Sequence, residues 1–143
     1  MKSVLVLFRN SAREPYIAVN ISLAAVIFMI FLYSAIFSPE KNNYPVVCIH
    51  EQLTGKPCVS CGLSHSFSLA VRGKFNEAQS WNPYGIRIFS FFLIQLAMRL
   101  SLTAVYLKLQ GSRRIIVLFD AIISSLLFLV AFYPFLKYIA ESL

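Results

Sequence analysis

The chain contains few charged residues for its length. Charged side chains make up 13% of its 143 residues, whereas a soluble domain carries roughly a quarter. Hydrophobic residues make up 58%, and too little polar sequence remains for a separate soluble domain. These proportions exclude an ordinary soluble protein and predict a single integral membrane domain over residues 1–143.

Other absences narrow the class of function. The net charge is +7, but the basic residues flank apolar segments and are not interleaved with aromatic residues as in RNA-binding proteins. The sequence has no internal repeat and no pair of spans broken by glycine or proline, which a transporter would be expected to show. It also lacks signatures of hydrolysis, phosphoryl transfer and dinucleotide binding. We therefore expect a lipid bilayer as the surroundings and no nucleic-acid partner, and a transporter or channel has little support.

Three apolar segments are long enough to cross a bilayer, which takes roughly 20 residues of helix. They are residues 17–37, 86–107 and 115–139. The first contains no charged residue and is followed by Pro39, which cannot continue a helix. The sequence predicts an all-α membrane protein with three transmembrane helices.

The basic residues predict the orientation of these spans. Six lie in the N-terminal segment, residues 1–16, and in the turn after the second span: Lys2, Arg9, Arg13, Lys108, Arg113 and Arg114. The long connection, residues 38–85, holds only four in 48 positions. Because cytoplasmic loops are enriched in Lys and Arg, we expect residues 1–16 and the turn to be cytoplasmic and residues 38–85 to be extracytoplasmic. The apolar run in residues 1–16 is too short for the core of a signal peptide, which favours an uncleaved first span over a cleaved leader.

Four charged residues fall inside the predicted spans: Arg87 and Lys137 lie close to span ends, whereas Arg99 and Asp120 lie deeper. Arg99 lies nine residues before Lys108, and Asp120 lies six residues after Arg114, so both sit roughly 9 to 14 Å from the turn at 1.5 Å per residue. Two interpretations follow: the two residues pair across the hairpin, or Arg99 extends its side chain to the headgroups. Either gives Arg99 and Asp120 a structural role rather than a place in an ion pathway.

All cysteines and histidines of the chain lie close together in the long connection. They are Cys48, His50, Cys58, Cys61 and His65. Two residues between Cys58 and Cys61 allow both sulfurs to face one centre, and Gly62 permits a positive φ directly after them. We call residues 58–62 the knuckle.

The knuckle leaves three states open. A tetrahedral zinc site, with its ligands drawn from these five cysteine and histidine residues, is one. A single disulfide among Cys48, Cys58 and Cys61 is another, because cysteines oxidise outside the cytoplasm, and it leaves one thiol over. Reduced thiols are the third. A c-type haem is disfavoured, because Gly62 stands where its histidine ligand is needed.

A short helix is expected after the knuckle, over residues 64–72. Ser64 suits the N-cap position, and Gly73 suits the residue that follows the helix end. Nine residues cannot span a bilayer, so this helix is expected to lie in the membrane interface. The chain then returns to the second span, with a turn at Asn82 and Pro83.

These residues, in this order, resemble the pattern of domain of unknown function 2752 (DUF2752), a family of small prokaryotic membrane proteins. The family pattern is a cysteine, then Leu-Thr-Gly, then Cys-Pro-x-Cys-Gly-x-Thr-Arg, then a short helix ending in Arg-Gly, then Ala and Asn-Pro. Here the matching positions are Cys48, Leu53, Thr54, Gly55, Cys58, Cys61, Gly62, Arg72, Gly73, Ala78, Asn82 and Pro83.

The resemblance covers residues 44–85, with two departures. Val59 replaces the knuckle proline, and Ser64 and His65 replace Thr-Arg. Serine keeps a hydroxyl, whereas histidine loses a permanent charge and adds a possible metal ligand. The resemblance implies a small multi-span membrane protein with a cysteine-bearing loop, and it implies no reaction. We expect the chain to lie in the bacterial inner (cytoplasmic) membrane.

Two functions follow as hypotheses. The first is a non-enzymatic accessory or assembly subunit of a larger membrane complex, in which the loop is held together by a disulfide or a zinc ion. The second is a membrane thiol-redox or metal-handling protein that uses Cys58 and Cys61, with Cys48 as resolving thiol and His65 tuning the site. In both, structural roles are expected for Gly62, Gly73, Asn82, Pro83, Arg99 and Asp120.

Overall fold

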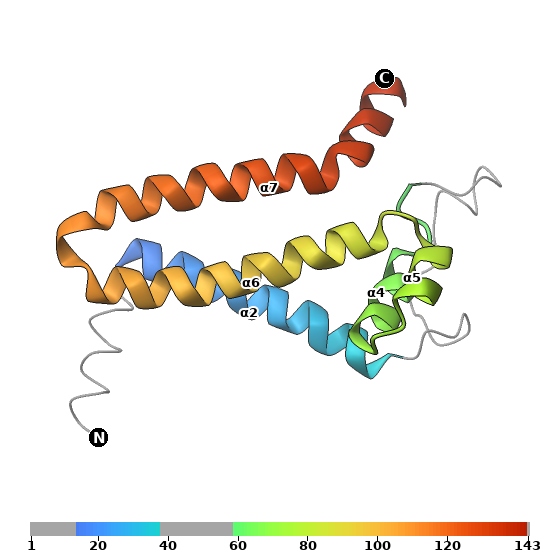
Figure 1. The fold of residues 1–143 in the computed structure, drawn as a ribbon, viewed down its shortest axis with the longest axis horizontal. Coiled ribbons are helices and arrows are strands. Elements are labelled where there is room, and N and C mark those ends of the chain that lie inside the picture. The colour runs from blue at the N-terminus through green and yellow to red at the C-terminus, as the bar shows by residue number, and fades with distance from the viewer. Residues whose placement is uncertain (1–13, 38–58, 143) are drawn as a thin grey trace.

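The computed structural model describes residues 14–37 and 59–142, and within these ranges it contains helices and turns but no strand. The elements are α2 (Pro15–Ile36), α4 (Leu63–Val71), α5 (Phe75–Trp81), α6 (Gly85–Lys108), the 3₁₀ turn η2 (Gln110–Ser112) and α7 (Arg113–Ser142) (Figure 1). Residues 1–13, 38–58 and 143 lie outside the described residues, and with them Cys48, His50 and Cys58.

Three helices, α2, α6 and α7, are long and apolar enough to cross a membrane. The predicted all-α class with three spans is therefore confirmed. The helices extend beyond most of the predicted boundaries, because hydropathy marks the apolar centre of a helix and not its polar ends. Pro15 occupies the first helical position of α2, where its missing N–H costs nothing. Pro134 lies inside α7, which changes direction in its C-terminal part (Figure 1).

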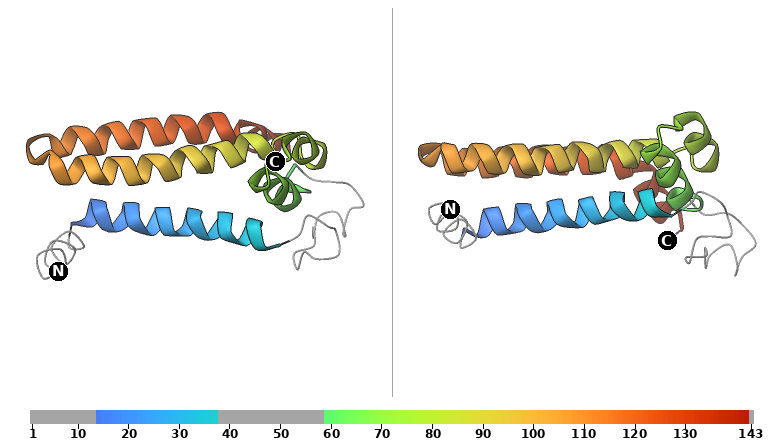
Figure 2. Two further views of the ribbon diagram at one scale, coloured as in Figure 1. Left: turned by 60° about the horizontal axis from the view of Figure 1, so that its bottom comes forward. Right: turned by 90° about the horizontal axis from the view of Figure 1, so that it is seen from below.

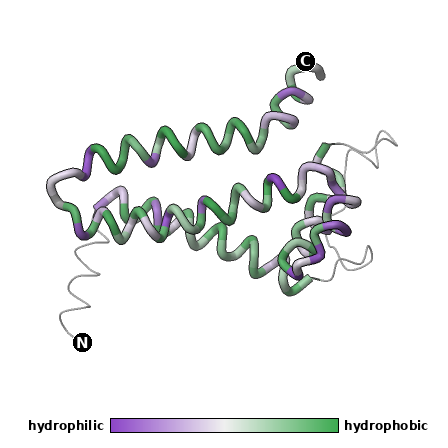
Figure 3. Tube along the Cα trace, in the orientation of Figure 1, coloured by the Kyte–Doolittle hydropathy of each residue, from purple (hydrophilic) through white to green (hydrophobic). Residues whose placement is uncertain are grey.

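Helix α6 is the centre of the bundle. It packs against α2 on one side and against α7 on the other, and η2 makes α6 and α7 an antiparallel hairpin (Figure 2). The N-terminal end of α2 lies at the η2 end of the bundle, whereas α4 and α5 fold over the opposite end. Helices α2 and α7 are green, that is hydrophobic, over most of their length (Figure 3), and many of their apolar side chains are exposed. Such exposed apolar faces are what a bilayer solvates.

Two small apolar clusters hold the ends of the bundle. At the η2 end, Ile17, Tyr106 and Ile116 bring one residue from each long helix together. At the other end, Leu69 and Ala70 of α4 pack on Ala78 of α5. The first cluster joins three helices that are distant in sequence. The second joins the short helices α4 and α5 to the start of α6, where Ile86 and Phe89 pack against it.

A buried ion pair joins the three long helices between these clusters. The Arg99 Nη1 atom of α6 lies 2.7 Å from the Asp120 Oδ2 atom of α7, and both side chains are at least 93% buried. The same Nη1 donates to the Asn20 Oδ1 atom of α2 at 2.8 Å. Pairing across the hairpin is therefore the interpretation that the structure supports, and Arg99 does not extend to the headgroups.

Further polar side chains complete the hydrogen bonds of this pair. The Tyr16 hydroxyl donates to Asp120 Oδ2 at 2.9 Å, and the Ser124 hydroxyl donates to Asp120 Oδ1 at 3.1 Å. The Arg99 Nη2 atom donates to Gln95 Oε1 at 2.9 Å and also to the Ser124 hydroxyl. Both charges thus have several partners, which is the condition under which a pair survives in a low-dielectric interior.

We predict that removing one charge destabilises the bundle more than removing both. Arg99→Met leaves the Asp120 carboxylate buried without its cation and is expected to cost about 3 to 5 kcal/mol of unfolding free energy. Arg99→Met combined with Asp120→Leu is expected to recover much of that loss. Unfolding of the detergent-solubilised protein, followed by circular dichroism, measures both values.

The control for this prediction is Arg87→Met, which removes an exposed cation from the same helix. Its effect should stay within about 0.5 kcal/mol. An Arg99→Met protein as stable as the unmodified chain would contradict the structural role assigned to the pair.

Candidate functional site

The predicted site lies in the part of the chain that covers one end of the bundle. We call residues 59–85 the cap; it comprises the described part of the knuckle, α4, α5 and the turn into α6 (Figure 1). Of the five predicted cysteine and histidine ligands, the structure describes Cys61 and His65, and both are half-buried. They stand four residues apart, on either side of the first turn of α4.

Gly62 is the N-cap of α4 and has a φ of +77°. Its carbonyl accepts the first helical hydrogen bond, from the Ser66 N–H at 2.9 Å. A Cβ at this position would lie 2.5 Å from the Trp81 carbonyl oxygen. Position 62 therefore requires glycine for two reasons: its backbone is left-handed, and α5 approaches too closely to leave room for a Cβ.

The predicted N-cap at Ser64 is wrong. The Leu63 N–H already bonds to the Ser60 carbonyl at 3.2 Å, so the turn of the knuckle runs directly into the helix. Helix α4 begins at Leu63, and Ser64 falls inside its first turn. The general preference of serine for N-caps was outweighed by a left-handed glycine two residues earlier.

Asn82 fixes the knuckle to the turn that precedes α6. Its Nδ2 atom donates to the carbonyls of Val59 and Cys61, both at 2.9 Å. Its Oδ1 atom accepts from the Tyr84 N–H, also at 2.9 Å, and the residue is 2% exposed. The sequence indicated a turn at Asn82 and Pro83, but not that the amide of Asn82 would hold two carbonyls of the knuckle.

Helix α5 was not expected from the sequence, yet it supplies one wall of the cap. Its Trp81 ring stacks on the His65 ring, with centroids 4.3 Å apart and an interplanar angle of 12°. The seven residues of α5 are too few to show a helical repeat of apolar side chains. The only residue nearby in sequence that indicates a helix here is Glu77, which lies in the first turn, where the helix dipole favours an acidic side chain.

A second close approach joins α4 to the start of α6. A Cβ on Gly85 would meet the side chain of Ser66, whose own Cβ is 2.6 Å away. Ser66 is fully buried, and its hydroxyl has no hydrogen-bond partner among the described residues. Gly85 thus permits the contact between α4 and α6, a role that sequence analysis missed.

Arg72 connects the cap to the end of α2. Its Nη2 atom donates to the carbonyls of Ala35 and Phe37 at 2.9 and 3.0 Å, and Nη1 reaches the Ser34 carbonyl at 3.3 Å. The last carbonyls of a helix lack partners within the helix, and the helix dipole attracts a cation there. Arg72 satisfies both conditions for α2. The sequence pattern includes Arg72 and Gly73, but nothing in it indicates that the end of α2 is the partner of the arginine.

Gly73, directly after Arg72, ends α4 as the sequence indicated. It has a φ of +76°, and its N–H bonds to the Ala70 carbonyl at 3.0 Å. The Lys74 N–H bonds to the Leu69 carbonyl at 3.0 Å, which completes a Schellman motif. The left-handed residue turns the chain from α4 directly into α5.

The predicted metal site and disulfide are not decided by the described residues. Three of the candidate residues, Cys48, His50 and Cys58, lie outside them. Within residues 14–37 and 59–142, no group of three or more His, Cys, Asp or Glu side chains is placed to hold a metal ion. What the structure contributes is the fixed backbone around Cys61 and the position of His65 against Trp81.

We predict different effects for alanine at the two left-handed glycines. Gly73→Ala has open space around the new methyl group and is expected to cost only the backbone strain of about 1 to 2 kcal/mol. Gly62→Ala adds a collision with the Trp81 carbonyl and is expected to cost more. Because the chain has a single tryptophan, Trp81 fluorescence should change in the Gly62 variant and not in the Gly73 variant. Equal unfolding midpoints and unchanged spectra for both would contradict the packing of α5 on the knuckle.

Comparison with known proteins adds one match. Neither the curated proteins nor the solved structures contain a match to this chain. The model of the family described as protein of unknown function (DUF2752) matches residues 48–96, from the cysteine loop through the cap into the first half of α6, and agrees over that region with the resemblance found in the sequence.

Proposed function

We propose that this chain is a multi-pass protein of the bacterial cytoplasmic membrane that serves as a non-enzymatic accessory or assembly subunit of a larger membrane complex. The observation that carries the proposal is the way the cap is fixed. Arg72 bonds to main-chain carbonyls at the end of α2 and holds the cap on the bundle. Asn82 bonds to carbonyls of the knuckle and fixes the cap internally. The cap then presents a pre-shaped surface at one end of the membrane-spanning helices.

A surface of this kind suits docking. Binding costs less when the interface is ordered beforehand, because fewer side chains and loops lose freedom on association. Phe75 on α5 is half exposed, and Trp81 is 39% exposed on the same short helix. Aromatic side chains exposed on an ordered element are common anchors of protein interfaces.

The use of charge in the chain also supports a structural role. The structure describes the side chains of three acidic residues, and each forms an ion pair. The pairs are Glu14 with Arg113, Glu77 with Lys74, and Asp120 with Arg99. Each pair joins neighbouring turns or helices, so in the described ranges the carboxylates hold elements together.

The proposed orientation places the N-terminus and the η2 turn in the cytoplasm, and residues 38–85 outside. The Glu14 Oε1 atom lies 3.0 Å from the Arg113 Nη1 atom, which brings the start of α2 to the η2 end of the bundle. The six basic residues of segment 1–16 and the turn then face the same side, as the positive-inside rule requires. In this arrangement the cysteine loop lies in an oxidising compartment, where a disulfide or a zinc ion would hold it together.

The proposal predicts a partner that is recovered through the cap. A tagged chain, crosslinked in native membranes and then purified, is expected to migrate with a defined membrane protein well above its own 16.2 kDa. Phe75→Ala should lower this recovery several-fold, because it removes an exposed aromatic anchor. Gln79→Ala, exposed on the same helix, is the matched control and should leave recovery unchanged. A chain that stays monomeric after crosslinking would rule out the accessory role.

A thiol-redox or metal-handling function is the second candidate. Cys61 directly precedes the N-cap of α4, and a helix N-terminus favours the thiolate form of a nearby cysteine. His65 stands one turn further on, against Trp81. In this function Cys58 and Cys61 would exchange electrons or pass a soft metal.

The intact mass of the protein, released without reductant or chelator, separates these states. A mass about 2 Da low is expected for one disulfide, since two thiol hydrogens are lost. An added mass of one zinc ion that a chelator removes would instead identify a metal site. If the double variant Cys58→Ser and Cys61→Ser supports unchanged function in cells, the redox and metal-handling candidate fails.

A further inference from the structure

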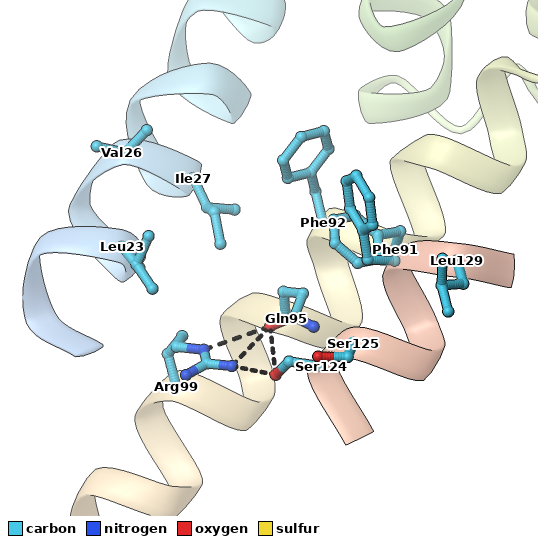
Figure 4. Close-up of a pocket in the computed structure, with 11 residues that line it drawn as sticks. Leu23, Val26, Ile27, Phe91, Phe92, Gln95, Arg99, Ser124, Ser125 and Leu129 are labelled. Atoms are coloured by element: carbon cyan, nitrogen blue, oxygen red, sulfur yellow. Dashed lines mark hydrogen bonds between the residues drawn. The ribbon is translucent and has the colours of Figure 1, made fainter. Parts of the chain in front are cut away.

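A groove opens between the three long helices, next to the buried ion pair. It has a volume of about 530 Å³ and runs along α6 from Phe91 to Arg99, with α2 and α7 as its sides. Its walls are aliphatic and aromatic, and its polar end is formed by Gln95, Arg99 and Ser124 (Figure 4). An apolar pocket of this volume with a few convergent polar groups has the character of a small-molecule site.

The polar end of the groove carries one unused hydrogen-bond donor. Gln95 is 6% exposed, and its Oε1 atom accepts from Arg99 Nε at 3.3 Å and from Arg99 Nη2 at 2.9 Å. Its Nε2 atom has no hydrogen-bond partner among the described residues. Figure 4 shows this nitrogen on the side of Gln95 that faces away from Arg99. A buried donor left without an acceptor is unfavourable within a bilayer, because no water is present there to accept its hydrogen bond.

The charges around Gln95 indicate a neutral ligand. The Arg99 guanidinium is already balanced by the Asp120 carboxylate, and both make further hydrogen bonds within the bundle. A carboxylate or phosphate entering the groove would therefore bring an uncompensated charge into a low-dielectric site. The group that suits the Gln95 amide is an uncharged acceptor such as a carbonyl oxygen.

The depth of Gln95 restricts the ligand further. It lies 13 residues before the end of α6 at Lys108, which is about 20 Å along the helix and near the middle of a hydrocarbon core of about 30 Å. The ester carbonyls of phospholipids stay at the interface, so they do not reach this depth. The ligand must carry its carbonyl into the core on a body that is itself lipid-soluble.

The shape of the groove favours such a molecule over a partner helix. Phe91 to Arg99 corresponds to only about 12 Å of α6, and the Arg99 cluster joins the three helices at one end. A helix that crosses the bilayer needs about 30 Å. Val26 and Leu129, at the sides, are 58% and 53% exposed, so the groove opens sideways toward the lipid. Phe91 and Phe128 meet edge-to-face, with ring centroids 6.3 Å apart and an interplanar angle of 67°, so a flat ring can stack on one of them and contact the edge of the other.

We propose that this groove binds a neutral, lipid-soluble carbonyl compound of the isoprenoid-quinone kind. A ring carbonyl accepts a hydrogen bond from Gln95 Nε2, the ring contacts the phenylalanines, and the apolar tail leaves between Val26 and Leu129. The inference stands independently of the accessory role, because it rests on the groove and not on the cap.

The test uses the full-length chain in lipid nanodiscs and two probes with the same tail. A decyl-substituted benzoquinone is expected to raise the unfolding temperature and to bind at least tenfold more tightly than decylbenzene, which lacks the carbonyls. Gln95→Met removes the amide at similar volume, while Arg99 keeps Asp120 and Asn20. This variant is expected to lose the preference for the quinone.

Two further variants keep the test decisive if Gln95→Met folds poorly. Ser125→Phe fills the groove from α7 and should weaken binding of both probes. Leu100→Ala, exposed outside the groove, should change neither. Equal affinity for the two probes, no binding of the quinone to the folded chain, or an unchanged preference in Gln95→Met would each overturn the proposal. A photo-crosslinker placed at residue 125 that captures a partner protein would also overturn the proposal, because the groove would then hold a protein.

Discussion

The contact on which the bundle depends is the buried Arg99–Asp120 pair. Apolar side chains give little preference for one helix arrangement within lipid, because lipid tails solvate them as well as a neighbouring helix does. A buried charge, in contrast, is stable only where an opposite charge and hydrogen-bond partners surround it. Arg99 is satisfied only where Asp120 of α7 and Asn20 of α2 reach it together. The pair therefore selects the register of all three helices, and it also determines which end of the groove is polar and which is apolar.

The cap is also held by polar side chains, but their partners are main-chain carbonyls. Arg72 bonds to the terminal carbonyls of α2, and Asn82 bonds to carbonyls around the knuckle. The carbonyls at helix ends and turns have no partner within their own element, so they need hydrogen-bond donors from other segments. The glycines act at the points of closest approach: Gly62 against Trp81 and Gly85 against Ser66. His65 supplies a ring that stacks on Trp81 and so joins the first turn of α4 to the end of α5.

Much of the fold could be predicted because its strongest signals are local. A run of apolar residues specifies a membrane-spanning helix wherever it occurs, and the short turn at Gly111 makes α6 and α7 neighbours. Gly73 could be placed because the end of a helix is set by its own backbone. The prediction failed at Ser64 and at α5. There the structure depends on contacts between the knuckle and residues 75–82, which no local window contains.

The sequence by itself determined the helical class, the three spans, the similar depth of Arg99 and Asp120 within them and the grouping of all cysteines and histidines in one connection. These depend on composition and on spacing along the chain, which bilayer thickness and helix rise translate directly into structure. Only the tertiary structure decided that Asn20 joins the Arg99 pair, that Asn82 holds the knuckle, and that Gln95 faces a groove with an unused donor. Each of these depends on the distance between side chains on different helices, and that distance is set by packing between segments far apart in sequence.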